Sequence, residues 1–198
     1  LQGEAVDVPE IQEFTSLSEK ELDRINTLVQ NLLKITKLDA GSIVLEKKPE
    51  DVAEMMNNVE LRFSYRAEQE QKKLVLFGEE DIFLSCDRDW ILEAVDNIVK
   101  NAMDHTKSGD TIEIKWRKSA SIVQIQIKDN GSGIHPEDLH HIFKRFYRSR
   151  FSKDQQGIGL GLPLAKMIIE AHNGTIEVNS ELGKGTMFTI SFLIPIKL

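Results

Sequence analysis

The sequence lacks paired cysteines for a disulfide, an apolar run for a membrane span and an excess of basic residues. Its single cysteine, Cys86, cannot form an internal disulfide, which fits a reducing compartment. No apolar run approaches the ~20 residues needed to cross a bilayer, and no secretory signal opens the chain. Acidic residues outnumber basic ones by 32 to 25, so a general nucleic-acid binder is disfavoured. We expect a globular domain with no nucleic acid among its partners and no direct membrane contact.

The length of 198 residues suits one domain with an appendage. The first residue is Leu1 and not Met, so we expect a piece of a longer protein whose other part holds any membrane anchor. A change of character at Ser42 divides the chain into an appendage, residues 1–41, and a domain, residues 42–198.

The appendage is predicted to be a loop followed by one long helix. Residues 1–16 show weak periodicity, and Ser18–Glu21 then form a capping box. Gly41 is placed to end the helix as a left-handed cap. Its apolar residues repeat in a narrow seam: Ile25, Leu28, Leu32 and Ile35. Such a seam favours partner helices over packing on the chain's own domain.

The domain combines strands that alternate in polarity with amphipathic helices. Strands are expected at 42–46, 74–77, 82–86, 111–117, 123–127, 176–178 and 188–194, and helices after Pro49, Asp87 and Pro163. The strands near 111–127 form a probable hairpin. One covered and one exposed sheet face predict a two-layer α/β sandwich with a mixed, largely antiparallel sheet.

The stretch from Asp129 to Gly161 has the chemistry of a nucleotide pocket. Asp129 follows Ile127 by two residues and so shares the apolar face of its strand, where its carboxylate needs a donor such as the amine of a base. Gly131 and Gly133 allow the backbone to pass close to a ligand. A plain Asp-Asn-Gly turn is the alternative for this motif.

A second glycine group, Gly157, Gly159 and Gly161, precedes a helix whose first turn holds Pro163. Free N–H groups at such a helix start favour anions. Neither a Walker loop nor a dinucleotide fingerprint matches the spacing. The turn at 183–186 is a further glycine-rich loop, with a simple hairpin as its alternative.

Polar residues form a ridge on the helix that begins near Asp87. Glu93, Asn97 and Asn101 step by four along one side, and their oxygens suit Mg²⁺, which keeps several waters and uses few protein ligands. A solvated polar face is the alternative for this helix taken alone.

A basic, aromatic segment lies between the two glycine groups. Its cations are Lys144, Arg145, Arg148, Arg150 and Lys153. The segment fits a nucleic-acid patch or a cover with an arginine for a terminal phosphate, and the acidic remainder of the chain favours the cover.

Together and in order, these motifs resemble the catalytic ATP-binding domain of sensor histidine kinases. Residues 97–106 resemble that family's asparagine box, Phe143 and Phe146 its phenylalanine box, and 129–134, 157–162 and 183–186 its glycine boxes. The long appendage helix resembles the second helix of the dimerisation hairpin. The resemblance implies a Bergerat-type fold with ATP between the helix layer and a flexible cover.

The resemblance also implies roles for individual residues. Asn101, with Asn97 beside it, would hold Mg²⁺, and Glu93 would orient groups near the phosphate. Asp129 would take the adenine amino group, and Arg148, with Arg145, would contact the γ-phosphate. The other implied nucleotide-binding residues are Gly131, Gly133, Ile134, Phe143, Tyr147, Gly157, Gly159, Leu160, Gly161, Leu162 and Thr186. The implied reaction transfers the γ-phosphoryl group to a histidine, for relay to a response-regulator aspartate.

Three departures from the family pattern matter. No histidine here has the H-E-x-R-T-P setting of the acceptor, Asp104 stands where many members carry lysine, and Ile158 replaces a frequent threonine. The acceptor is therefore expected outside this chain, on a cytoplasmic, membrane-anchored bacterial sensor that forms homodimers. With half of a four-helix bundle absent, we expect weak self-association or none. The alternative functions are another ATPase of the same fold or a non-catalytic nucleotide-sensing or docking module.

Overall fold

The computed structural model describes residues 8–149 and 157–194. Its main sheet has the strand order β2-β4-β5-β7-β6. The β2–β4 pair is parallel and the other pairs are antiparallel, which confirms the predicted mixed, largely antiparallel sheet. The strands are β2 (Lys73–Gly78), β4 (Thr111–Lys118), β5 (Ile122–Asp129), β6 (Gly174–Glu181) and β7 (Gly185–Leu193).

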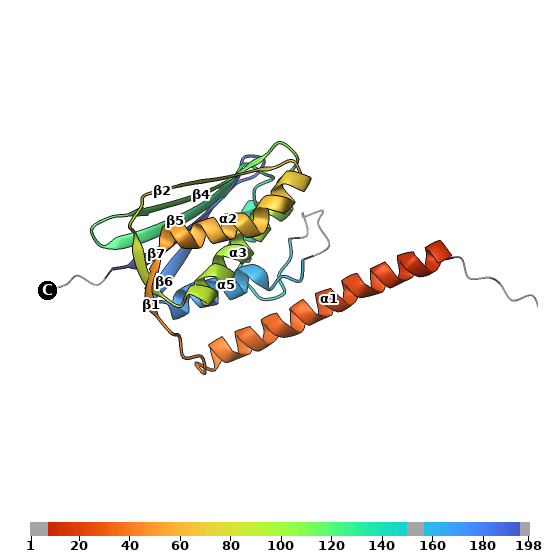
Figure 1. The fold of residues 1–198 in the computed structure, drawn as a ribbon, viewed down its shortest axis with the longest axis horizontal. Coiled ribbons are helices and arrows are strands. Elements are labelled where there is room, and N and C mark those ends of the chain that lie inside the picture. Colours follow the sequence, from red (N-terminus) through yellow and green to blue (C-terminus); the bar gives the residue numbers. More distant parts are fainter. Residues whose placement is uncertain (1–7, 150–156, 195–198) are drawn as a thin grey trace, which may run out of the picture.

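A layer of helices covers one face of this sheet (Figure 1). It consists of α2 (Val52–Gln69), α3 (Arg88–His105) and α5 (Gly161–Ala171). The alternating apolar residues of the central strands all turn toward these helices and are buried: Ile112, Ile114, Trp116, Val123, Ile125, Ile127, Phe188, Ile190 and Phe192. The two-layer α/β sandwich is therefore confirmed, and burial of its apolar interface is the main favourable term in folding.

Two small elements complete the domain. The strand predicted at residues 42–46 is wrong, because that segment has no strand pairing, and β1 (Lys48–Asp51) instead pairs with β3 (Phe83–Cys86). Asp51 then caps α2 through its Oδ1, which accepts hydrogen bonds from the N–H groups of Ala53 and Glu54. A short helix, α4 (Pro136–Leu139), follows the first glycine loop.

The helix preceding the domain, α1 (Val8–Asp39), is longer than predicted. The expected start at Ser18 is wrong, since the helix runs through that position, and the predicted loop is wrong for residues 8–16; residues 1–7 lie outside the described part. Gly41, at φ +59°, ends the helix as predicted, with the N–H of Ser42 bonded to the carbonyl of Lys37.

Only the C-terminal part of α1 packs on the domain. Ile35 is buried there, and α1 contacts α5, whereas the N-terminal half projects past the domain (Figure 1). Ile25 and Val29 remain largely exposed. Over the described residues, α1 and the other helices all fall short of the length and apolar character of a membrane span.

Candidate functional site

A cavity of about 1680 Å³ opens between α1, α3 and the glycine loops. Glu93, Asn97 and Asn101 form its α3 wall. Most of the predicted binding residues line it as well: Gly133, Ile134, Tyr147, Arg148, Gly157, Gly159, Leu160, Gly161, Leu162 and Thr186. Residues far apart in the sequence, such as Asn97 and Thr186, thus line one cavity.

Asp129 lies behind the cavity lining, bonded to Thr186, and is almost fully buried at 4% exposure. Its Oδ1 accepts hydrogen bonds from the N–H groups of Gly131, at 2.9 Å, and Thr186, at 3.3 Å. Burial raises the pKa of Asp129 above its ordinary value, and these two backbone donors partly offset that rise. A ligand amine would add a donor to a carboxylate that the fold holds in an apolar wall.

The first glycine loop is pinned between α3 and the β6–β7 turn. The N–H of Ser132 bonds to the carbonyl of His105, and the carbonyl of Ser132 accepts the N–H of Gly183. A Cβ on Gly131 would lie 2.3 Å from the carbonyl oxygen of His105, so this position has no room for a side chain. Gly131 therefore allows the loop to approach the end of α3 closely, and it is not part of the cavity lining.

The second glycine loop presents the start of α5 to the cavity. Leu160 occupies the N-cap without a side-chain hydrogen bond, so the first N–H groups of α5 have no side-chain cap. A Cβ on Gly161 would lie 2.8 Å from Oδ1 of Asn97, which shows how closely the loop approaches α3. Free N–H groups at a helix start attract anions, and bare glycine lets a phosphate come near.

The two asparagines of α3 are oriented differently. Nδ2 of Asn97 donates to the carbonyl of Glu93 at 2.9 Å, which leaves its Oδ1 facing Gly161. No hydrogen bond within the described part of the chain engages the side chain of Asn101. Both side chains therefore have an amide oxygen available as a ligand. Mg²⁺ prefers oxygen ligands, so the residues present fit the metal.

Four of the predicted residues are not among those that line the cavity: Asp129, Gly131, Phe143 and Arg145. Phe143 packs edge-on against Phe188, with ring centroids 6.4 Å apart. Arg145 turns toward α1 and bonds to Asp39 at 2.7 Å. Neither contact was foreseeable from local spacing. Arg150 and Lys153, predicted for the cover, lie outside the described residues.

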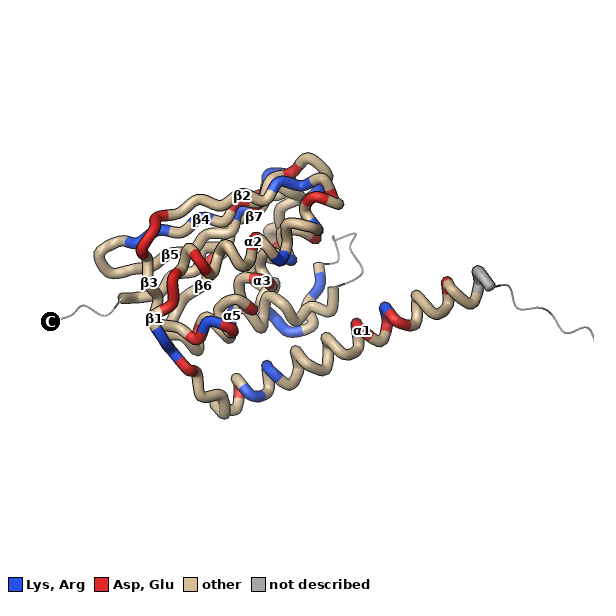
Figure 2. Tube along the Cα trace, in the orientation of Figure 1, with Lys and Arg blue, Asp and Glu red and all other residues tan. Residues whose placement is uncertain are grey.

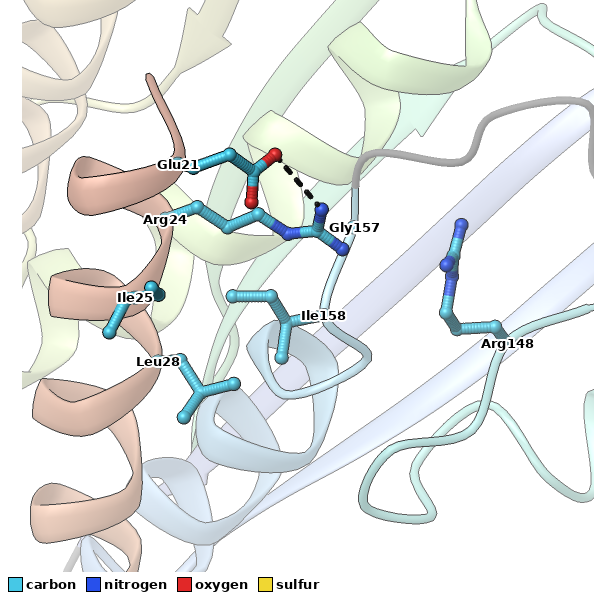
Figure 3. A pocket seen from close by; sticks show the side chains of 7 residues that line it. All are labelled: Glu21, Arg24, Ile25, Leu28, Arg148, Gly157 and Ile158. Atoms are coloured by element: carbon cyan, nitrogen blue, oxygen red, sulfur yellow. Dashed lines mark ion pairs between the residues drawn. The ribbon is translucent and has the colours of Figure 1, made fainter. Parts of the chain in front are cut away.

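A smaller cavity of about 330 Å³ separates α1 from the second glycine loop. Figure 3 shows Ile25 and Leu28 of α1 on one side of it and Ile158 on the other. Arg148 lies at its far side, and Glu21 pairs with Arg24 within α1 at 3.6 Å. The helix therefore faces the second glycine loop across a gap.

Two α3 side chains of the cavity wall pair with cations that the motifs did not single out. Lys34 of α1 bonds to both carboxylate oxygens of Glu93 at 2.6 Å. Arg66 of α2 bonds to Asp104 at 2.7 Å. The sequence marked Asp104 as unusual for the family, but it could not predict that its partner is Arg66 on another helix.

Comparison with known proteins decides the family. Residues 86–196, more than half of the chain, match the model of the histidine kinase-, DNA gyrase B- and HSP90-like ATPases. The chain belongs to this family. The matched region contains the asparagine ridge, Asp129 and the glycine loops, so the ATPase signature coincides with the cavity.

Relatives narrow the type to sensor histidine kinases. The chain is 34% identical over 197 residues to the sensor protein SrrB of Staphylococcus aureus, covering 98% of this chain and 34% of SrrB. It thus spans about a third of that relative's length. The solved histidine kinase AdeS of Acinetobacter baumannii is 25% identical, with a TM-score of 0.76 over 91% of this chain and 83% of AdeS.

A further solved structure supports the fold. Histidine kinase ThkA, described in complex with the response regulator protein TrrA, is 24% identical with a TM-score of 0.78, covering 96% of this chain and 53% of that one. The chain is therefore an ATPase-family domain similar to the ATP-binding domains of sensor histidine kinases, as the motif order predicted.

Proposed function

We propose that this domain positions ATP for transfer of its γ-phosphoryl group to a histidine outside the chain. The observation that carries the proposal is the cavity that joins Asn97 and Asn101 to the start of α5, with the buried Asp129 bonded to Thr186 of its lining. It offers an acceptor for the adenine amine at one end and N–H donors for phosphates at the other. Catalysis would then rest on positioning and charge stabilisation.

Each polar group has a part in this proposal. Asp129 would accept the adenine amine, and Asn101, with Asn97, would hold Mg²⁺. The bound metal would neutralise charge on the phosphate oxygens. Arg148 lines the same cavity and would bind the terminal phosphate, whereas Arg145 would do so only after leaving Asp39. Glu93, now paired with Lys34, would orient groups near the phosphate.

The partner of the reaction also belongs to the proposal. The relative ThkA is described with a response regulator, and we extend that partner class to this chain. We further propose that residues 1–41 are the end of a dimerisation hairpin and 42–198 the catalytic domain, and that the whole protein is a membrane-anchored sensor whose kinase part is cytoplasmic. The extent of the SrrB relative, about three times this length, supports the longer parent.

Calorimetric titration with a non-hydrolysable ATP analogue, with and without Mg²⁺, tests the site. Asp129→Asn should abolish binding while the domain stays folded, because an asparagine Oδ1 still accepts the N–H groups of Gly131 and Thr186. Asn101→Ala should remove only the Mg²⁺-dependent part of the affinity. Thermal melts of both variants serve as the folding control.

The same titrations can also contradict the proposal or favour an alternative function. Full binding by Asp129→Asn would overturn the role of that carboxylate. A folded wild-type chain that binds no nucleotide would favour the docking-module alternative. Phosphohistidine formed on a separately supplied acceptor helix would favour the kinase over another ATPase of this fold.

A further inference from the structure

Lys100 lies on the cavity-facing side of α3. It lies three residues after Asn97 and four before Asp104, and all three side chains line the cavity. Residues three and four apart on a helix are neighbours on its surface. The Lys100 ammonium is therefore within one helical turn of the asparagines proposed to hold the metal.

The carboxylates around Lys100 are paired with cations from other helices. Lys34 of α1 holds both oxygens of Glu93 at 2.6 Å. Arg62 of α2 bonds to Asp96, and Arg66 of α2 bonds to Asp104 at 2.7 Å. On an isolated helix, Asp96 and Asp104 would be the natural i±4 partners of Lys100.

Arg66 is held firmly in this arrangement. Its Nε donates to Glu70 at 2.6 Å while its Nη2 donates to Asp104. Glu70 is also bonded by Lys72, whose ammonium donates to the carbonyl of Met103 at 2.6 Å. The network fixes Asp104 toward α2 and away from pairing with Lys100.

Lys100 consequently keeps an uncompensated charge. It is exposed, and among the described cations of α2 and α3 that line the cavity it alone has no carboxylate partner. The neighbouring acids are neutralised and so do not repel an anion placed there. An unpaired ammonium with three donors on a flexible stem suits a phosphate group.

We propose that Lys100 binds the terminal phosphates of the nucleotide, and that Arg62 and Arg66 are positioning residues that keep it available. The assignment rests on the proposed ATP site and adds a phosphate ligand from outside the glycine loops and the predicted arginines. It also gives the α2–α3 ion pairs a role beyond stability.

Calorimetry on the whole chain at fixed Mg²⁺ tests the assignment, with the ATP analogue and adenosine as probes. Lys100→Met should weaken the analogue about 10- to 100-fold, which is the usual range for one hydrogen bond to a charged group. Adenosine affinity should not change. Lys107→Met is the matched control, since Lys107 also lines the cavity in an exposed position but follows the end of α3.

A second pair of variants tests the positioning role. Arg66→Met should release Asp104 to pair with Lys100 and so weaken the analogue, and adding Asp104→Asn should restore the affinity. A purely structural role for Arg66 would lower the melting temperature without this rescue. Equal analogue affinity in Lys100→Met and wild type would overturn the assignment alone, whereas a wild type that binds neither probe would overturn the proposed function with it.

Discussion

His172 lies buried at the end of α5, where the fold uses both of its ring nitrogens. Nδ1 donates to the carbonyl of Ile168 at 2.8 Å, and Nε2 accepts the N–H of Asp87 at 3.1 Å. Only the neutral ring with its proton on Nδ1 can satisfy both partners. Burial lowers the pKa of His172 below its ordinary value, so the protonated form is disfavoured in the folded chain.

This arrangement predicts a loss of stability in mild acid. A histidine whose pKa falls on folding stabilises the native state above its unfolded pKa of about 6.5, and that contribution is lost as the pH falls from this value through the lower folded pKa. Urea unfolding at pH 7.5 and pH 5.5 should show a lower free energy of unfolding at pH 5.5. His172→Gln should shrink the difference, whereas the exposed His140→Gln should leave it unchanged. The prediction fails if both variants keep the wild-type difference.

At the scale of single residues, the sequence predicted those features of the site that depend on neighbouring positions in the chain. The alternation that carries Ile127 predicted that Asp129 would be buried, and it is. The contacts of Arg145 and Phe143 could not be predicted in this way, because Asp39 and Phe188 lie far along the chain. Lys100 gave no motif signal either, since its importance depends on which cations α2 brings to α3.

Among the elements, the first glycine loop has a strict backbone requirement. Gly133 has φ +66°, and a Cβ there would lie 2.1 Å from the carbonyl oxygen of Glu181. By contrast, a Cβ on Gly157 would meet nothing within 4 Å among the described residues. Both glycines line the same cavity, so they form a matched pair.

We expect Gly133→Ala to destabilise the domain by at least about 2 kcal/mol, because a left-handed backbone costs about 1–2 kcal/mol and the carbonyl must also shift. Gly157→Ala should stay within about 0.5 kcal/mol of wild type. Calorimetric melting checks both, and a drop of at least about 4 °C is expected for Gly133→Ala alone. Similar melting temperatures for the two variants would contradict this difference.

Element types were predictable from periodicity, and the element boundaries were less so. The capping-box pattern at Ser18 did not start a helix, because the amphipathic repeat of α1 continues back to Val8. The first strand forms at residues 48–51, where pairing with β3 satisfies its backbone, and not at 42–46. Long-range pairing therefore overrode local β-propensity.

For the molecule as a whole, α1 is the element left without a full set of partners. Its apolar residues spread over two sides: Ile35 is buried on α5, while Leu22, Ile25, Val29 and Leu33 remain exposed. Figure 2 shows an uncharged stretch along the middle of α1, and the sequence has no charged residue between Arg24 and Lys34. An uncharged, exposed apolar stripe on a projecting helix fits packing against further helices.

We predict that this chain alone self-associates weakly, because one helix per copy supplies half of a four-helix bundle. Analytical ultracentrifugation across a concentration series checks this, with Ile25→Lys and Val29→Lys as variants that should abolish any residual association. A tight dimer in the unmodified chain would be inconsistent with the prediction.

The ion pairs at the end of α1 have a mechanical consequence. Lys34 and Asp39 hold Glu93 and Arg145 from one continuous helix of 32 residues. Their tips lie roughly 6 Å from the helix axis, given a diameter of about 10–12 Å. A twist of about 20° would displace them by ~2 Å, and N–O contacts of 2.6 and 2.7 Å would then exceed hydrogen-bond range. A rotation of α1 about its own axis would therefore separate Lys34 from Glu93 and Asp39 from Arg145 together, because one helix carries both partners.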